Sequence, residues 1–107
     1  MTPEARVLTA IVRYLHCRRQ AGHPIFWIKL HGGPMQRAGM PDLLVIFYGH
    51  ALAIEVKRPG GKATRLQNFT LSEMESAGAT CAVVSCVQDV DAILREAADA
   101  AGGKHDD

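Results

Sequence analysis

The sequence predicts a single α/β domain with a mixed central sheet, helices on both faces, and the order α-β-β-β-α-β-α. Its length allows one domain only, because 107 residues can enclose one hydrophobic core but not two. Segments with helical periodicity alternate with short β-prone runs along the chain. Two of these runs are apolar at almost every position, which predicts that helices cover the sheet on both sides.

The first helix is predicted to begin after Thr2, a residue type that caps helices, with Pro3 at the first helical position. Apolar residues then recur at helical spacing until the pattern stops near Gly22: Val7, Leu8, Ile11, Val12 and Leu15. Residues 25–30 form a β-prone run, and a loop rich in glycine and proline follows at 31–40.

The centre of the predicted sheet is a hairpin. Pro41 opens a strand over residues 42–48, and a turn at Gly49 and His50 leads into a strand over 52–58. The sequence Pro59-Gly60-Gly61 ends this strand.

The C-terminal half adds a helix, a strand and a second helix. Thr64 is expected to cap a helix that runs to about Ala77 and stops at Gly78. A β-branched run at 80–86 predicts the fourth strand, and a last helix extends from Asp89 to about residue 101. The domain therefore spans 1–101, and we expect 102–107 to be a flexible polar tail.

Charge is distributed unevenly, although the net charge is only +1. Residues 1–65 hold ten Lys and Arg against three acids (Glu4, Asp42 and Glu55), whereas residues 66–107 hold two against eight. This asymmetry predicts one basic face, which would suit a polyanionic partner. The alternative is a chance asymmetry spread over a compact fold.

The three cysteines are odd in number and form no Cys-x-x-Cys pair, which favours a reducing compartment over a disulfide framework or a zinc site. No apolar run reaches about 18 residues, and the N-terminus lacks the pattern of a signal peptide. We therefore expect a cytoplasmic protein that does not cross a membrane.

Two of the three acids in the basic half lie at the ends of the predicted hairpin strands. A two- or four-residue turn around Gly49 and His50 would place Asp42 opposite Lys57. Because side chains alternate along a strand, Asp42, Glu55 and Lys57 would then share one face. A turn of odd length would put Asp42 on the other face and separate the group.

These residue types suit a divalent metal. Mg²⁺ prefers hard oxygen ligands, so Asp42 and Glu55 with the phosphate oxygens of a substrate would suffice. The backbone carbonyl of Val56 could supply another oxygen. Lys57 would lie close enough to orient or deprotonate the attacking water, or to stabilise charge on the phosphate. The alternative is a structural ion cluster at a strand edge.

Two further polar residues have both a functional and a structural interpretation. Glu4 shares the inward face of the first helix with Leu8 and Ile11, so it could bind a second metal, directly or through water, or merely favour the helix N-terminus. Gln67 could point at the sheet, but with Thr64 it also forms a capping-box pattern.

The loops that flank the acidic residues carry candidate phosphate contacts. Their alternative is an ordinary solvated charged loop. The candidates are Lys29, His31, Arg37, Arg58, Lys62 and Arg65.

With Gly39-x-Pro41-Asp42, Glu55-Val56-Lys57, Gln67 and an acid in the first helix, the chain resembles the VRR-NUC family, the virus-type replication-repair branch of the PD-(D/E)XK nucleases. The resemblance spans Glu4 to about Cys86 and implies a restriction-endonuclease-like core. It implies that Asp42 and Glu55 bind Mg²⁺ or Mn²⁺, that Lys57 is catalytic, and that Glu4 and Gln67 belong to the site.

The resemblance also implies a function. Small stand-alone members of this family resemble Holliday-junction resolvases, which act as two-fold dimers. The expected location of this chain is the cytoplasm of a bacterial or phage-infected cell. We therefore expect a homodimeric endonuclease that cuts branched DNA, since a symmetric junction needs two matched cuts. The alternatives are a restriction-like or DNA-processing nuclease on linear duplex, and a DNA-binding module that keeps the fold without cutting.

Overall fold

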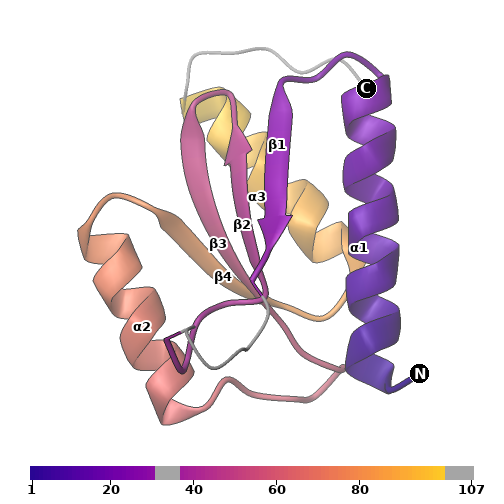
Figure 1. Cartoon of the computed structure of the whole chain (residues 1–107). Helices are drawn as coiled ribbons and strands as arrows, with labels where there is room; N and C mark the ends of the chain where they lie inside the picture. The colour runs from indigo at the N-terminus through magenta and orange to yellow at the C-terminus, as the bar shows by residue number, and fades with distance from the viewer. Residues whose placement is uncertain (31–36, 101–107) are drawn as a thin grey trace.

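The computed structural model describes residues 1–30 and 37–100, which form three helices and one four-stranded sheet (Figure 1). The elements follow the predicted α-β-β-β-α-β-α order, and the predicted fold class is confirmed. Their bounds are α1 Pro3–Gln20, β1 Ile25–Lys29, β2 Leu43–Phe47, β3 His50–Val56, α2 Arg65–Ser76, β4 Thr80–Val84 and α3 Val87–Ala100.

The sheet is mixed, with the strand order β1-β2-β3-β4. Strands β1, β2 and β3 pair antiparallel, whereas β3 and β4 pair parallel. A parallel pair needs a crossover connection, and α2 supplies it. The last predicted helix begins at Val87, two residues earlier than the sequence suggested.

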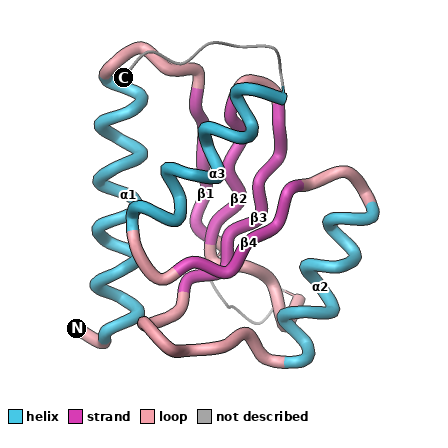
Figure 2. The backbone as a smooth tube through the Cα atoms, turned by 180° about the vertical axis from the view of Figure 1, so that it is seen from behind, coloured by secondary structure: helices cyan, strands magenta, loops and turns pink. Residues whose placement is uncertain are grey.

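Helices α1 and α3 cover one face of the sheet, and Figure 2 shows α3 lying in front of the strands from that side. Their buried residues pack in one core with the side chains of every second sheet position. This core includes Ile11, Leu15, Leu43, Val45, Phe47, Leu52, Ile54, Val90 and Leu94. Tyr14 of α1 donates a hydrogen bond to Asp91 of α3, and Asp91 also pairs with Arg95 at 2.8 Å.

Helix α2 belongs to the opposite face, where it lies beside β3 and β4 (Figure 1). It starts with a capping box: the Thr64 hydroxyl accepts from the Gln67 amide, and the Gln67 side-chain oxygen accepts from the Thr64 amide. The predicted Thr64 cap is thus confirmed. No helix of the described residues is long and apolar enough to cross a membrane.

Candidate active site

The β2–β3 hairpin brings the predicted acidic residues together. Its two-residue turn is Tyr48-Gly49, and both residues have positive φ, as a type I′ hairpin turn requires. Phe47 pairs with His50 and Leu43 with Ile54, so the register extends to Asp42 opposite Glu55. Because the turn is even, Asp42 and Glu55 share a sheet face, as predicted.

The predicted pairing was wrong by two residues. The sequence favoured a turn at Gly49 and His50, with Asp42 opposite Lys57, whereas the turn lies one residue earlier and Asp42 is opposite Glu55. The reason is local: Tyr48 adopts a φ of 50°, a conformation that non-glycine residues rarely take. Since a shift of two preserves the face, the correction brings the two carboxylates closer together.

Glu55 is the most unusual group of this site, because its carboxyl is buried inside the protein, with 2% of the residue exposed. One oxygen, Oε2, lies 3.3 Å from Nζ of Lys57. The other, Oε1, has no hydrogen-bond partner among the described residues. Burial, together with the negative charge of Asp42, raises the pKa of Glu55 to about 7, although Lys57 opposes this shift.

Asp42 is held in place by the neighbouring strand. Its Oδ2 accepts a hydrogen bond of 2.7 Å from the amide of Val56 at the end of β3. Its own carbonyl accepts a hydrogen bond from the Leu30 amide. The carboxylate is thereby fixed beside Glu55 rather than left to rotate freely.

This donor set fits a hard divalent cation. A carboxyl oxygen without a partner inside the protein costs free energy, and two adjacent carboxylates repel unless one is protonated or a cation lies between them. Asp42 and Glu55 form a pair only, because the described residues contain no group of three or more His, Cys, Asp or Glu side chains placed to hold a metal ion together. A pair suffices for Mg²⁺, which keeps several waters and binds substrate phosphate oxygens.

Glu4 and Gln67 differ in how the structure places them. Glu4 is exposed in the first turn of α1 and is not gathered with Asp42 and Glu55 into a three-acid group. The side-chain oxygen of Gln67 is used by the capping box, whereas its side-chain nitrogen makes no hydrogen bond within residues 1–30 and 37–100. Catalytic roles for Glu4 and Gln67, and the Val56 carbonyl as a ligand, stay predictions.

The predicted phosphate contacts that the structure describes are all exposed: Lys29, Arg37, Arg58, Lys62 and Arg65. Arg58 and Lys62 belong to the connection between β3 and α2, which spans residues 57–64, and Arg65 is the first residue of α2. Arg37 is already paired with Glu73 of α2. His31 lies outside the described residues.

The sequence did not single out Thr70, one turn after Gln67 on α2. Its side chain is buried, and its hydroxyl has no hydrogen-bond partner in the described part of the chain. The only signal in the sequence is the three-residue spacing from Gln67, which places both side chains on neighbouring positions of one helix face.

Gly39, three residues before Asp42, packs directly against α2. Its φ is +82°, and a Cβ atom there would lie 2.6 Å from Cγ of Leu66 and 3.1 Å from both the Leu66 carbonyl oxygen and Oγ1 of Thr70. We expect Gly39→Ala to lower the free energy of unfolding by about 2–3 kcal/mol, from backbone strain and displacement of α2. Urea denaturation followed by circular dichroism measures this.

The matched control for this substitution is Gly60→Ala. Gly60 has the same φ of +82°, but a Cβ atom there would meet open space. Gly60→Ala should therefore lower the free energy of unfolding by the backbone strain alone, about 1 kcal/mol. Equal losses for the two variants would show that the approach of Gly39 to α2 is not a tight contact.

The sequence matches no family model and no curated protein. A solved structure described as a VRR_NUC domain is similar to it, at 27% sequence identity and a TM-score of 0.71. The match covers 89% of this chain and 97% of that domain. The resemblance to the VRR-NUC family is confirmed. The VRR-NUC fold is that of a nuclease domain. In this chain, Asp42, Glu55 and Lys57 lie together at one end of the sheet.

Proposed function

We propose that this VRR-NUC domain is a metal-dependent, structure-selective DNA endonuclease that hydrolyses phosphodiester bonds. The observation that carries the proposal is the buried Glu55 carboxyl between Asp42 and Lys57, with one oxygen unpartnered among the described residues. Such an arrangement is costly for stability, and strained or underpartnered groups of this kind cluster at functional sites.

The carboxylates and the lysine of the site have different proposed roles. Asp42 and Glu55 would hold Mg²⁺ or Mn²⁺, which when bound supplies a Lewis acid for the phosphate and for water. Lys57, whose ammonium lies 3.3 Å from Glu55, would orient the attacking water or stabilise the negative charge on the phosphate. Glu4 and Gln67 are proposed to complete the site.

The substrate is proposed to be branched DNA, with Holliday junctions as its symmetric form, cut by a homodimer. The exposed cations Arg58, Lys62 and Arg65 follow Lys57 in the chain and would contact the phosphate backbone near the cleavage point. Arg37 would exchange its pairing with Glu73 for a phosphate, because exposed ion pairs are worth only about 0–1 kcal/mol.

A cleavage assay tests this function. A four-way junction and a linear duplex of the same sequence are incubated with protein and Mg²⁺ or Mn²⁺, with and without a chelator. We expect paired cuts in the junction that require the metal, and little cutting of the duplex. Equal cutting of both substrates would instead favour a nuclease for linear duplex. If the protein binds DNA in a salt-sensitive way but yields no cleavage products with either metal ion, it is a DNA-binding module and not a nuclease.

A further inference from the structure

Three side chains form a cluster at the edge of the sheet, where α1 lies beside β1 (Figure 1). The guanidinium carbon of Arg19 lies 4.4 Å from the centre of the Trp27 ring. The imidazole of His16 stands perpendicular to the same ring, with the two ring centres 4.7 Å apart. His16 also contacts Arg19, since Nδ1 of the imidazole lies 3.3 Å from Nη2 of the guanidinium. Two side chains of α1 therefore contact one indole ring of β1.

The cluster is accessible to solvent and positively charged. Arg19 and His16 are exposed, and Trp27 is only partly buried. No carboxylate pairs with Arg19 in the described part of the chain, and the sequence contains no acid between Glu4 and Asp42. Because cation–π contacts at exposed sites are weak, the guanidinium can leave the ring easily. The indole is thus an aromatic surface under a movable cation.

The cluster also lies close to the candidate active site along the strand. β1 is an edge strand, and the Leu30 amide that follows it donates a hydrogen bond to the Asp42 carbonyl. Trp27 precedes Leu30 by three residues, which corresponds to about 10 Å along the strand. The register puts Trp27 and Asp42 on opposite faces of the sheet. Since no strand lies beyond β1, DNA that passes round this edge meets the indole.

We propose that Trp27 is a stacking site for an unpaired nucleobase of the DNA substrate, and that Arg19 binds the adjoining phosphate. The base takes the place of the guanidinium over the indole, and Arg19 turns to the phosphate. This exchange is favourable, because a base stacks on an aromatic ring more strongly than an exposed cation does, and a guanidinium binds phosphate well. The inference deepens the proposed function, on which it rests for DNA as the partner: it assigns an unpaired nucleotide to the branch point.

The positive charge at the end of α1 also has a structural explanation. Arg18 and Arg19 lie in the last turn, where cations stabilise the negative end of a helix. That effect needs a cation near the helix end but no aromatic ring beneath it, and Arg18 already supplies one. It does not account for the position of Arg19 over Trp27, which a base-stacking site uses.

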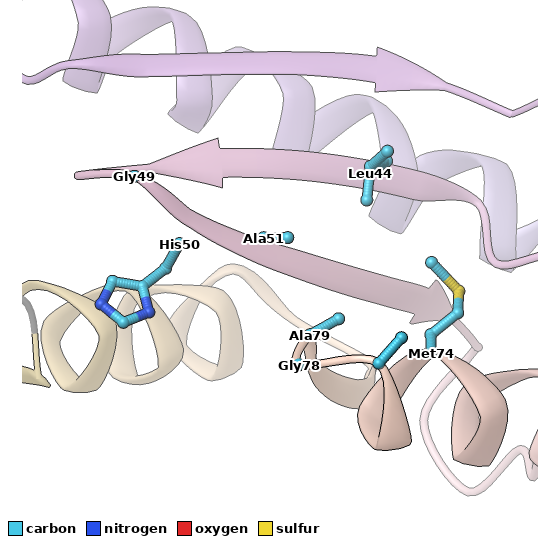
Figure 3. Close-up of a pocket in the computed structure, with 8 residues that line it drawn as sticks. Leu44, Gly49, His50, Ala51, Met74, Gly78 and Ala79 are labelled. Atoms are coloured by element: carbon cyan, nitrogen blue, oxygen red, sulfur yellow. The ribbon is translucent and has the colours of Figure 1, made fainter.

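A groove on the other face of the sheet suits a nucleotide less well (Figure 3). It has a volume of about 380 Å³ and lies between the β2–β3 hairpin and the end of α2, where Leu44, Ala51 and Met74 belong to its lining. His50 also lines this groove, but no lysine or arginine does, so nothing there would hold the phosphate that accompanies a base.

The sequence contains a single tryptophan, so the tryptophan fluorescence of the full chain reports on Trp27 alone. Oligothymidylate is titrated into the protein in the presence of a chelator, and binding is followed in parallel by the anisotropy of a labelled oligonucleotide. We expect saturable quenching of the fluorescence by oligothymidylate. An abasic oligonucleotide with the same number of phosphates, and a blunt duplex, should bind without quenching, because neither offers an unpaired base.

Substitutions separate stacking from general attraction by charge. Arg19→Gln and Trp27→Leu, which keeps an apolar side chain but removes the ring, are each expected to weaken oligothymidylate binding about tenfold in anisotropy. The matched control is Arg13→Gln, which removes the same charge from an exposed position on the same helix and should bind as the wild type does. Circular dichroism confirms that each variant is folded.

The proposal is overturned if oligothymidylate fails to bind, or binds without changing the fluorescence of Trp27. Equal quenching by the blunt duplex, or equal losses for Arg19→Gln and Arg13→Gln, overturns it as well. These measurements need no metal, so they are separable from cleavage. If oligothymidylate quenches but no metal produces cuts in any DNA, the stacking site stands and the nuclease proposal falls. If junctions are cut while the fluorescence never changes, the nuclease stands and the stacking site falls.

Discussion

Replacing Lys57 with Met, or Glu55 with Gln, is expected to reduce cleavage of the preferred DNA by about a hundredfold to a thousandfold. Lys57→Met keeps the length of the side chain but removes the ammonium that lies 3.3 Å from Glu55. Glu55→Gln keeps the shape of the buried group but removes its negative charge, which is proposed to bind the metal. Single-turnover cleavage rates at saturating Mg²⁺ measure both losses.

Binding separates a catalytic role from a structural one. DNA affinity at matched salt should change little, because the exposed cations that follow Lys57 remain in place. The control variants remove the same charges from exposed helix positions: Arg13→Gln on α1 and Glu96→Gln on α3. If both site variants cut at wild-type rates while folded, the assigned site is incorrect.

The cleavage rates of Glu55→Gln and Lys57→Met should also respond differently to the concentration of metal. Because Glu55 is proposed as a metal ligand, Glu55→Gln should weaken metal binding, and raising the concentration of Mn²⁺ is expected to recover part of its rate. Lys57→Met should not be recovered in this way, because Lys57 is assigned to the phosphate or the attacking water. Recovery of both variants, or of neither, would contradict this division of roles.

The sequence predicted the element order and the shared face of Asp42 and Glu55 because both depend on simple periodicities. Alternation along two short strands leaves only the parity of the turn open, and Tyr48-Gly49 provides an even one. The exact register of the hairpin could not be predicted from these periodicities. It depends on Tyr48 accepting a positive φ, which its residue type does not suggest.

Contacts between segments that are far apart in the chain were harder to predict from the sequence than local features. The Thr64–Gln67 capping box is a local feature and was found in the sequence. The burial of Thr70 and the approach of Gly39 to α2 arise from two segments that meet only in the folded chain. The sequence also gave no sign that α2 would lie to one side and leave Phe26 and Ile46 exposed, since helical periodicity identifies a buried stripe but not its partner.

Stability without metal is expected to fall as the pH rises from 5 to 8, which is the opposite of acid denaturation. The pKa of Glu55 is about 7 in the folded state, against an ordinary value of 4.5, so the folded state binds more protons than the unfolded state between these pH values. The stabilisation by the protonated carboxyl is complete below about pH 4.5 and is lost as the pH rises through 7. The expected loss is on the order of 2 kcal/mol.

Thermal unfolding in chelator across this pH range measures the slope, and Glu55→Gln should flatten it because an amide does not titrate. Asp89 and Asp91 do not interfere, since their pKa values are lowered by hydrogen bonds from Ser85 and from Arg95 respectively, and they titrate below this range. A wild-type slope of the opposite sign, or one that survives in Glu55→Gln, would contradict the assignment.

Metal should reverse this behaviour. Adding Mg²⁺ or Mn²⁺ is expected to stabilise the folded chain more at pH 8 than at pH 5.5, because a cation competes with the proton for the Glu55 carboxylate. Asp42→Asn should reduce the metal effect, since it removes the second carboxylate of the proposed metal site, opposite Glu55 in the hairpin register. Stabilisation that is equal at both pH values, or that is unchanged in Asp42→Asn, would place the metal elsewhere. At a metal-binding site, ionisation of a buried acid destabilises the folded protein, and binding of a cation to the carboxylate restores that stability.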